Sequence, residues 1–226
     1  MCAFVPVNIP IAFGLICLPA TGFNIFFFNF INQSYNALMN LANGSGTDDS
    51  AKFILMSYSL ALISSIGTGM YLKRLFSKKQ NMNLVQEGIL RVLPSGIAGF
   101  LNAFFMRSDY ISKGIKVKDE NGNVLGLSKK CGTKAVVEGA FSRMVLPMPL
   151  LLNHFLIKYI KNFKFSLRLH IFLELLFCGI ALGVGLPFSI AIFKQYSEVS
   201  LENVEEEIRI NAEKLGSKKV IYNKGL

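Results

Sequence analysis

The sequence predicts an all-α integral membrane protein with about five transmembrane helices, several of them broken by proline or glycine. A small β-hairpin loop and a C-terminal amphipathic helix complete the prediction. Hydrophobic residues make up 52% of the 226 residues and charged residues only 17%, whereas a soluble domain carries about 25% charge. The charges gather in short segments between long apolar stretches, as in membrane proteins. The net charge of +10 forms no basic stripe on any expected helix, so nucleic acid is not an expected partner.

Five stretches approach the roughly 20 apolar residues that a bilayer span needs. They are residues 4–18, 51–72, 84–106, 135–157 and 167–193. Several contain prolines, which membrane helices tolerate where neighbouring helices satisfy the freed backbone groups. We expect a transmembrane domain over residues 1–193, in contact with membrane lipid, and a C-terminal tail over residues 194–226.

Two further segments have recognisable local patterns. Alternating residues flank the pair Asn121-Gly122 in the loop 107–134, which is the strongest short signal for a β-hairpin. The tail contains an acidic amphipathic run over Val199 to Leu215, which predicts a surface helix. The four cysteines show no zinc-site spacing, so we expect small apolar core residues, no metal and no cofactor.

The most informative segment is the helix expected over residues 23–43. Its polar residues recur at spacings of three or four, so that most of them share one helix face. They are Asn29, Asn32, Gln33, Ser34, Asn36 and Asn40. Amides in apolar surroundings need partners, since each unmet group costs about 1–3 kcal/mol. The stripe either joins this helix to its neighbours or lines a path for a small polar solute.

Ionisable residues inside the apolar stretches are the other candidates for function. They are Glu87, Arg91, Glu138, Arg143 and Glu174. Glu87 and Arg91 are four residues apart, so a helix would let them neutralise each other. Arg143 lies one turn before Pro147 and Pro149, where a guanidinium beside a broken helix can hold a carboxylate. Glu174 either pairs with Arg143 or relays a proton.

Sequence motifs of enzymes are missing from the chain. We find no Walker-A loop, no H-E-x-x-H, no G-x-S-x-G and no dinucleotide-binding glycine pattern. With two histidines, a histidine-based catalytic or metal site is not expected. We therefore expect a protein that is not an enzyme.

Four separated motifs resemble those of one family, the sideroflexins, which are multi-span proteins of the mitochondrial inner membrane. The motifs are Ile31-Asn32-Gln33-Ser34-Tyr35-Asn36-Ala37, Asp119-Glu120-Asn121-Gly122-Asn123, Arg143-Met144-Val145-Leu146-Pro147-Met148-Pro149 and Tyr222-Asn223-Lys224-Gly225-Leu226. The resemblance covers essentially the whole chain in the same order. Sideroflexins also carry a soluble N-terminal region with a His-Pro-Asp-Thr-Gly-Glu motif, which does not occur here. The resemblance therefore implies either a fragment or a form that has lost this region.

The resemblance implies a carrier of small polar metabolites, serine above all, that supplies mitochondrial one-carbon metabolism. In this interpretation the amide stripe binds the polar groups of an amino acid and Arg143, beside Pro147 and Pro149, binds its carboxylate. The segment Pro147-Met148-Pro149 looks most like the branch discussed as citrate carriers, so a tricarboxylate is the alternative substrate, with Arg91 and Arg143 as counter-charges. A third interpretation is a membrane scaffold that assembles a respiratory complex and transports nothing.

Overall fold

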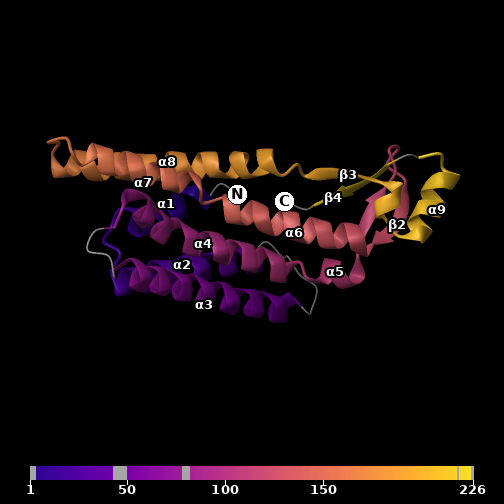
Figure 1. Ribbon diagram of the computed structural model, residues 1–226, viewed down its shortest axis with the longest axis horizontal. Helices are drawn as coiled ribbons and strands as arrows, with labels where there is room; N and C mark the ends of the chain where they lie inside the picture. Colours follow the sequence, from indigo (N-terminus) through magenta and orange to yellow (C-terminus); the bar gives the residue numbers. More distant parts are fainter. Residues whose placement is uncertain (1–3, 43–49, 78–81, 218, 225–226) are drawn as a thin grey trace.

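The computed structural model describes residues 4–42, 50–77, 82–217 and 219–224, and helices dominate it (Figure 1). The helices are α1 (Phe4–Ile16), α2 (Gly22–Ala42), α3 (Ser50–Ser77), α4 (Leu84–Met106), α5 (Asp109–Lys113), α6 (Lys129–Val145), α7 (Pro149–Ile160), α8 (Leu167–Ile192) and α9 (Glu206–Lys214). The strands are β1 (Ile115–Lys118), β2 (Val124–Ser128), β3 (Tyr196–Ser200) and β4 (Lys219–Asn223), and a 3-10 turn η1 (Leu201–Asn203) follows β3.

Four helical segments of the described residues are long and apolar enough to cross a membrane. They are Ile54–Phe76, Leu84–Met106, Lys129–Ile160 and Leu167–Ser189. The shortest of these have 23 residues, about 35 Å at 1.5 Å per residue, against a hydrocarbon thickness of about 30 Å. The predicted all-α membrane fold is confirmed. The first expected span differs, because α1 has only 13 residues and is too short to cross a bilayer alone.

The third long segment is broken at its middle, where the sequence predicted a kink. Helix α6 ends at Val145 and α7 begins at Pro149. Pro147 and Pro149 have no N–H to donate, and the intervening Met148 N–H donates to the Val145 carbonyl at 2.9 Å. The regular α-helical hydrogen bonding is therefore interrupted inside the apolar region, while α4 and α8 continue through Pro94 and Pro187.

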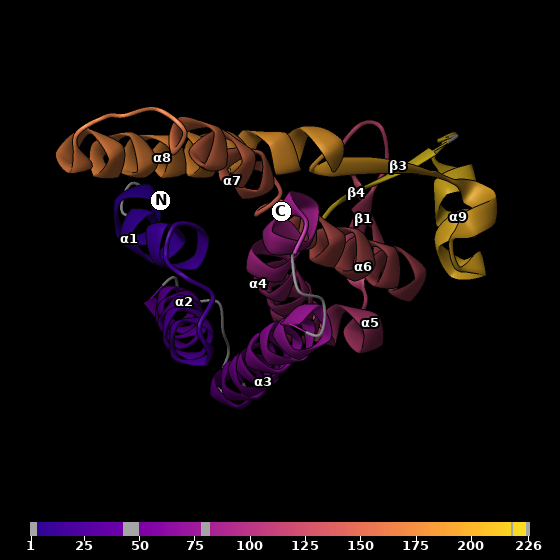
Figure 2. The ribbon, with the colours of Figure 1, turned by 60° about the vertical axis from the view of Figure 1, so that its left-hand side comes forward.

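The long helices pack side by side around α4. Figures 1 and 2 show α8 along one edge of the molecule and α3 along the opposite edge, with α4 and α6 between them. Helix α4 contacts α3 and α6 extensively, α2 packs on α3 and α1, and α8 packs on α1 and α7. The approach of α4 to α6 is very close, because a Cβ at Gly99 would lie 2.9 Å from the Arg143 carbonyl oxygen. Such close backbone contact is typical of small residues at membrane helix interfaces.

A small antiparallel sheet lies at one end of the bundle (Figure 1). The expected hairpin is present, since β1 pairs with β2 across a turn that contains Gly122 at φ +89°. Asp119 fixes this turn by accepting hydrogen bonds from the backbone of Asn121 at 2.9 Å and Asn123 at 2.7 Å. The side-chain amide of Asn123 also lowers the pKa of the Asp119 carboxyl, so the turn is held by an ionised acceptor.

The prediction of one surface helix over 199–215 was wrong for its first part. Residues 196–200 form β3, and only 206–214 form helix α9. Strands β3 and β4 complete the sheet in the order β2-β1-β4-β3, because alternating apolar residues such as Val220 and Tyr222 lie buried against Val117 of the hairpin. The tail and the loop 107–134 thus share one core, and the boundary expected at residue 194 runs through this unit.

Candidate functional site

A short non-helical segment separates α1 from α2 in the helix bundle, and this segment is called the break below. Helix α1 ends at Ile16, Pro19 interrupts the chain, and α2 begins at Gly22. Thr21 starts the new helix, because its Oγ1 accepts a hydrogen bond from the Asn24 backbone at 3.1 Å, which is the usual way to satisfy the first amides of a helix. The side chain of Asn24 donates to the Pro19 carbonyl at 2.8 Å and holds the break in shape.

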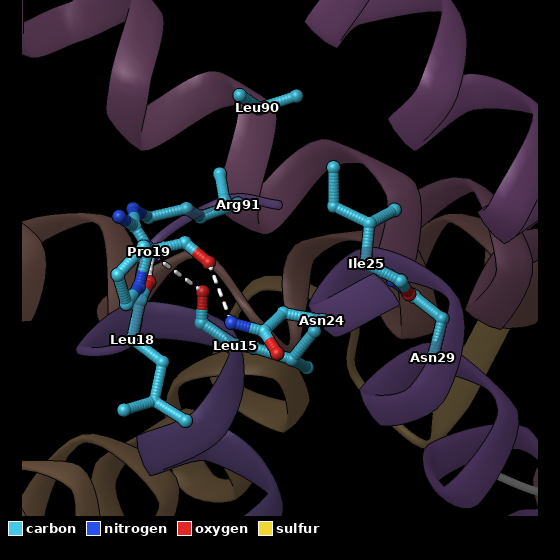
Figure 3. Close-up of a pocket in the computed structure, with 9 residues that line it drawn as sticks. Leu15, Leu18, Pro19, Asn24, Ile25, Asn29, Leu90 and Arg91 are labelled. Atoms are coloured by element: carbon cyan, nitrogen blue, oxygen red, sulfur yellow. Dashed lines mark hydrogen bonds between the residues drawn. The ribbon is translucent and has the colours of Figure 1, made fainter. Parts of the chain in front are cut away.

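The guanidinium of Arg91, on α4, is hydrogen-bonded to the backbone at this break (Figure 3). Its Nη1 donates to the Leu15 carbonyl at 2.9 Å and to the Leu18 carbonyl at 2.7 Å. Carbonyls at the end of a helix lack partners inside the helix and carry partial negative charge, so they attract a guanidinium. The Nε atom of Arg91 is buried and has no hydrogen-bond partner among the described residues.

A cavity of about 20 Å³ lies beside this guanidinium (Figure 3). Leu18, Pro19, Asn24, Asn29 and Arg91 are among the residues that line it. A volume of about 20 Å³ holds roughly one water molecule. In this conformation the cavity has room for a small polar group and is closed to a whole metabolite.

The amide stripe on α2 faces the protein interior only in part. Asn29 and Gln33 are 3% and 1% exposed, and the Asn29 Nδ2 donates to the Ile25 carbonyl at 2.8 Å. The Oδ1 of Asn29 and the Oε1 of Gln33 are buried without a hydrogen-bond partner among the described residues. Buried polar atoms almost always have partners, so these two oxygens require an explanation.

The remaining stripe residues lie nearer the surface of the bundle. Asn32, Ser34 and Asn36 are half-buried, and the Ser34 hydroxyl lies 3.1 Å from the Tyr58 hydroxyl of α3. The side chain of Asn40 lies outside the described part of the structure. Ser34 therefore contacts a neighbouring helix.

The structure separates the stripe from the predicted carboxylate site at Arg143, Pro147 and Pro149. Helix α2 packs on α1 and α3, whereas α6, which carries Arg143, packs on α4, α5 and α8. Figure 2 shows α2 and α6 on opposite sides of α4. The side chain of Arg143 is exposed at the bundle surface. The cation that shares a cavity with Asn29 is Arg91.

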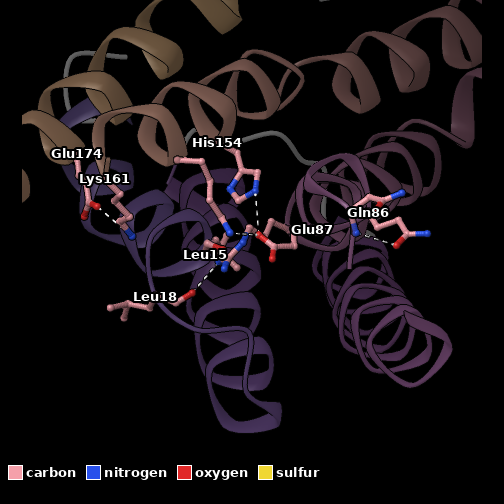
Figure 4. Close-up of polar contacts among 10 residues, drawn as sticks. Leu15, Leu18, Gln86, Glu87, His154, Lys161 and Glu174 are labelled. Atoms are coloured by element: carbon pink, nitrogen blue, oxygen red, sulfur yellow. Dashed lines mark hydrogen bonds and ion pairs between the residues drawn. The ribbon is translucent and has the colours of Figure 1, made fainter. Parts of the chain in front are cut away.

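The predicted pairing of Glu87 with Arg91 is not formed. Figure 4 shows Glu87 turned toward α7, where Lys158 Nζ lies 2.8 Å and His154 Nε2 3.5 Å from its Oε2. His154 is 2% exposed. Lys158 reaches Glu87 on a flexible stem, while the helix-end carbonyls of α1 engage Arg91.

The other two intramembrane acids also have cationic partners. Glu174 lies 3.3 Å from Lys161 (Figure 4). Of the two alternatives for Glu174, the pairing with Arg143 is not formed, and its partner lies across the turn between α7 and α8. Glu138 pairs with Lys224 of the C-terminal segment, whose carbonyl accepts a hydrogen bond from Arg107 at 3.1 Å. Each acid thus tethers one element to another.

Sequence reasoning missed three of these groups: Asn24, His154 and Lys158. Thr21, two residues after Pro19 and three before Asn24, is a recognisable helix start that marks the break. His154 and Lys158 are four residues apart on α7 and share a face, which signals a polar patch. Nothing local indicates that this face meets Glu87.

Comparison with known proteins places the chain among related sequences. The family model of the sideroflexins matches residues 1–226. Human sideroflexin-5 is 33% identical over an alignment that covers 100% of this chain and 68% of the relative. The sideroflexin of Dictyostelium discoideum is 31% identical over 99% of this chain and 71% of the relative, and sideroflexin FSF1 of Saccharomyces cerevisiae is 33% identical over 88% and 64%. No solved structure matches the chain.

Proposed function

The chain belongs to the sideroflexin family, and from that premise we propose that it is a transporter of the mitochondrial inner membrane for a small polar metabolite. The substrate that the amide side chains suit best is serine or another neutral amino acid, which would supply one-carbon metabolism. The protein is a multi-pass membrane protein, with four membrane-length helices among its described residues. Its partners in this proposal are the metabolite and the surrounding lipid, with no part for a cofactor or an enzymatic reaction.

One observation carries the proposal: the amide oxygens of Asn29 and Gln33 are buried inside the bundle and have no hydrogen-bond partner among the described residues. A purely structural amide would bond to a neighbouring helix, because an unmet group costs about 1–3 kcal/mol. An amide that binds a solute obtains its hydrogen-bond partner only when the solute is bound. The oxygens of both side chains are acceptors, which suits the ammonium and hydroxyl groups of serine.

Broken helices supply the second requirement of a transporter, which is movement about a fixed site. The breaks at residues 17–21 and 146–148 divide the apolar region into shorter rods. The cavity of about 20 Å³ is too small for serine, so serine would bind only after the cavity widens. Transport then requires α1 and α2 to move apart.

Gln33→Leu tests the proposal in proteoliposomes loaded for uptake of radiolabelled serine. The substitution removes an unpartnered buried polar group, so we expect serine uptake to fall at least tenfold while thermal stability is unchanged or higher. Asn153→Leu is the matched control, since Asn153 is a buried amide on α7 whose Nδ2 donates to Cys178 Sγ at 3.3 Å and whose Oδ1, like that of Asn29, has no hydrogen-bond partner among the described residues. It separates the loss of an amide on α2 from the loss of any buried amide. This control is expected to keep its uptake.

Equal uptake by wild type and Gln33→Leu contradicts the role of the amide face. A loss of stability in Gln33→Leu would instead favour the structural interpretation, in which the amide joins helices.

A tricarboxylate such as citrate is the second candidate substrate, and one observation favours it. Arg91 has no carboxylate partner among the described residues, so its charge is available to an anion. Competition for serine uptake by citrate separates the two: strong inhibition supports the anion carrier, and none supports the neutral amino acid.

A further inference from the structure

Arg91 forms no ion pair with the described residues of the apolar part of the protein, and Glu87 acts on it only from a distance. It is the eighth residue of α4, about 10 Å along the helix axis from Leu84. The acid one turn earlier, Glu87, is engaged by Lys158 and His154. Charged groups in a membrane are costly and usually pair or serve function. The guanidinium of Arg91 therefore lacks a direct carboxylate contact among the described residues.

The end of α1 and the first turn of α2 border the same cavity as this guanidinium. The Leu15 and Leu18 carbonyls at the end of α1 accept its two hydrogen bonds, and the capped first turn of α2 begins at Gly22. The start of a helix presents free N–H groups and favours anions. An anion at the break would lie between the guanidinium and the start of α2.

Two unpartnered polar atoms belong to the residues around the same cavity, and they constitute an independent observation. Arg91 Nε is a buried donor and Asn29 Oδ1 a buried acceptor, each without a partner among the described residues. Both residues line the cavity of about 20 Å³. The donor matches a carboxylate and the acceptor matches an ammonium or a hydroxyl.

We propose that Arg91 binds the carboxylate of the transported metabolite, at the break between α1 and α2. The carboxylate replaces the Leu15 and Leu18 carbonyls on the guanidinium, because an ionised acceptor binds it more strongly than a neutral carbonyl does. The released carbonyls free the end of α1, so that ligand binding itself widens the cavity. The inference rests on the proposed function for the nature of the ligand, which is serine or citrate.

Ligand binding to the whole protein in detergent tests the assignment, with thermal stability as the readout. Serine, citrate and serinol, which is serine with an alcohol in place of the carboxylate, are titrated separately. We expect serine or citrate to stabilise the wild type and serinol to bind at least tenfold more weakly. Arg91→Gln should lose about tenfold or more in affinity for the carboxylate ligand and should no longer distinguish serine from serinol.

Three further variants serve as controls for Arg91→Gln. Arg91→Lys keeps the charge and a bond to the helix-end carbonyls, so it should fold even if Arg91→Gln does not, with a reduced preference for the carboxylate. Arg168→Gln, at an exposed position of α8, should bind as the wild type does. Arg143→Gln tests the carboxylate site that the sequence predicted, and we expect it to bind normally.

The assignment is overturned if neither serine nor citrate stabilises the wild type, if Arg91→Gln and Arg91→Lys titrate as the wild type does, or if the loss falls on Arg143→Gln. Uptake into proteoliposomes separates this outcome from failure of the proposed function. A protein that binds carboxylates through Arg91 but moves none across the membrane keeps the site and loses the transport role.

Discussion

Glu205 ties the C-terminal tail to the start of α6, and its removal has a calculable effect. Its carboxylate accepts hydrogen bonds from the Ser128 hydroxyl at 2.6 Å and from the backbone N–H groups of Lys129 at 2.8 Å and Lys130 at 2.9 Å. Glu205→Ala removes all three. A hydrogen bond to a charged group contributes about 1.5–3 kcal/mol, and loss of a helix cap costs about 0.5–2 kcal/mol. Because the two exposed N–H groups regain water, we expect about 1–3 kcal/mol of local stability to be lost.

Cys131 reports this loss directly, since it lies three residues after Ser128 and is 2% exposed. In a variant that keeps Cys131 as the only cysteine, a thiol-reactive dye labels it when the start of α6 opens. A loss of about 1–3 kcal/mol raises the open population, and with it the labelling rate, about 5- to 150-fold. Glu207→Ala is the matched control, because it removes the same charge at an exposed position two residues away. An unchanged labelling rate in Glu205→Ala, or an equal rise in Glu207→Ala, refutes the reasoning.

The remaining predictions concern pH and packing. Burial alone would raise the pKa of Glu205, but the hydrogen bonds from Ser128, Lys130 and Lys129 outweigh it and hold the pKa below its ordinary value. The stability that Glu205 contributes is therefore complete above about pH 4.3 and is lost as pH falls through the folded-state pKa. Thiol labelling itself slows in acid because the thiolate is the reactive form, so the rate is divided by that of a free thiol at the same pH. This ratio should rise in acid for Cys131 of the wild type and much less in Glu205→Gln. Gly99→Val should destabilise the protein by about 1–3 kcal/mol, seen as a lower melting temperature, because its Cβ meets the carbonyl of Arg143 at 2.9 Å; a wild-type melting temperature would contradict the close approach of α4 and α6. Lys224→Met removes the cationic partner of Glu138 and should lower the free energy of unfolding by about 1–3 kcal/mol. The double variant Lys224→Met with Glu138→Leu should recover most of this stability. A double variant that is equally unstable would exclude the ion pair as the cause.

The membrane helices could be predicted because their signals are local. The segment 84–106 is one continuous apolar stretch and coincides with α4. The pair Asn121-Gly122 likewise determines its own turn, because glycine alone adopts the positive φ of Gly122 without strain. The break at Pro147 and Pro149 follows from the missing N–H groups of proline.

The parts that failed depend on partners far away in the sequence. Strand β3 reads as the start of an amphipathic helix until β4 pairs with it and β1 receives them both. Arg91 reads as a partner of Glu87 until the end of α1 presents its carbonyls. In each case the sequence shows which groups need partners, and only the packing decides which partners they obtain.

Water access to the amide face of α2 tests the central claim most directly. In a cysteine-free background, Gln33→Cys places a thiol at the buried position and Phe30→Cys places one at a position on the apolar surface that is 41% exposed. A charged, membrane-impermeant thiol reagent is applied to proteoliposomes. The transport account predicts that the thiol at position 33 reacts and that the thiol at position 30 stays inert in lipid. Protection by serine is not part of this prediction, because Gln33→Cys removes a proposed serine ligand. A thiol at position 33 that never reacts contradicts the account.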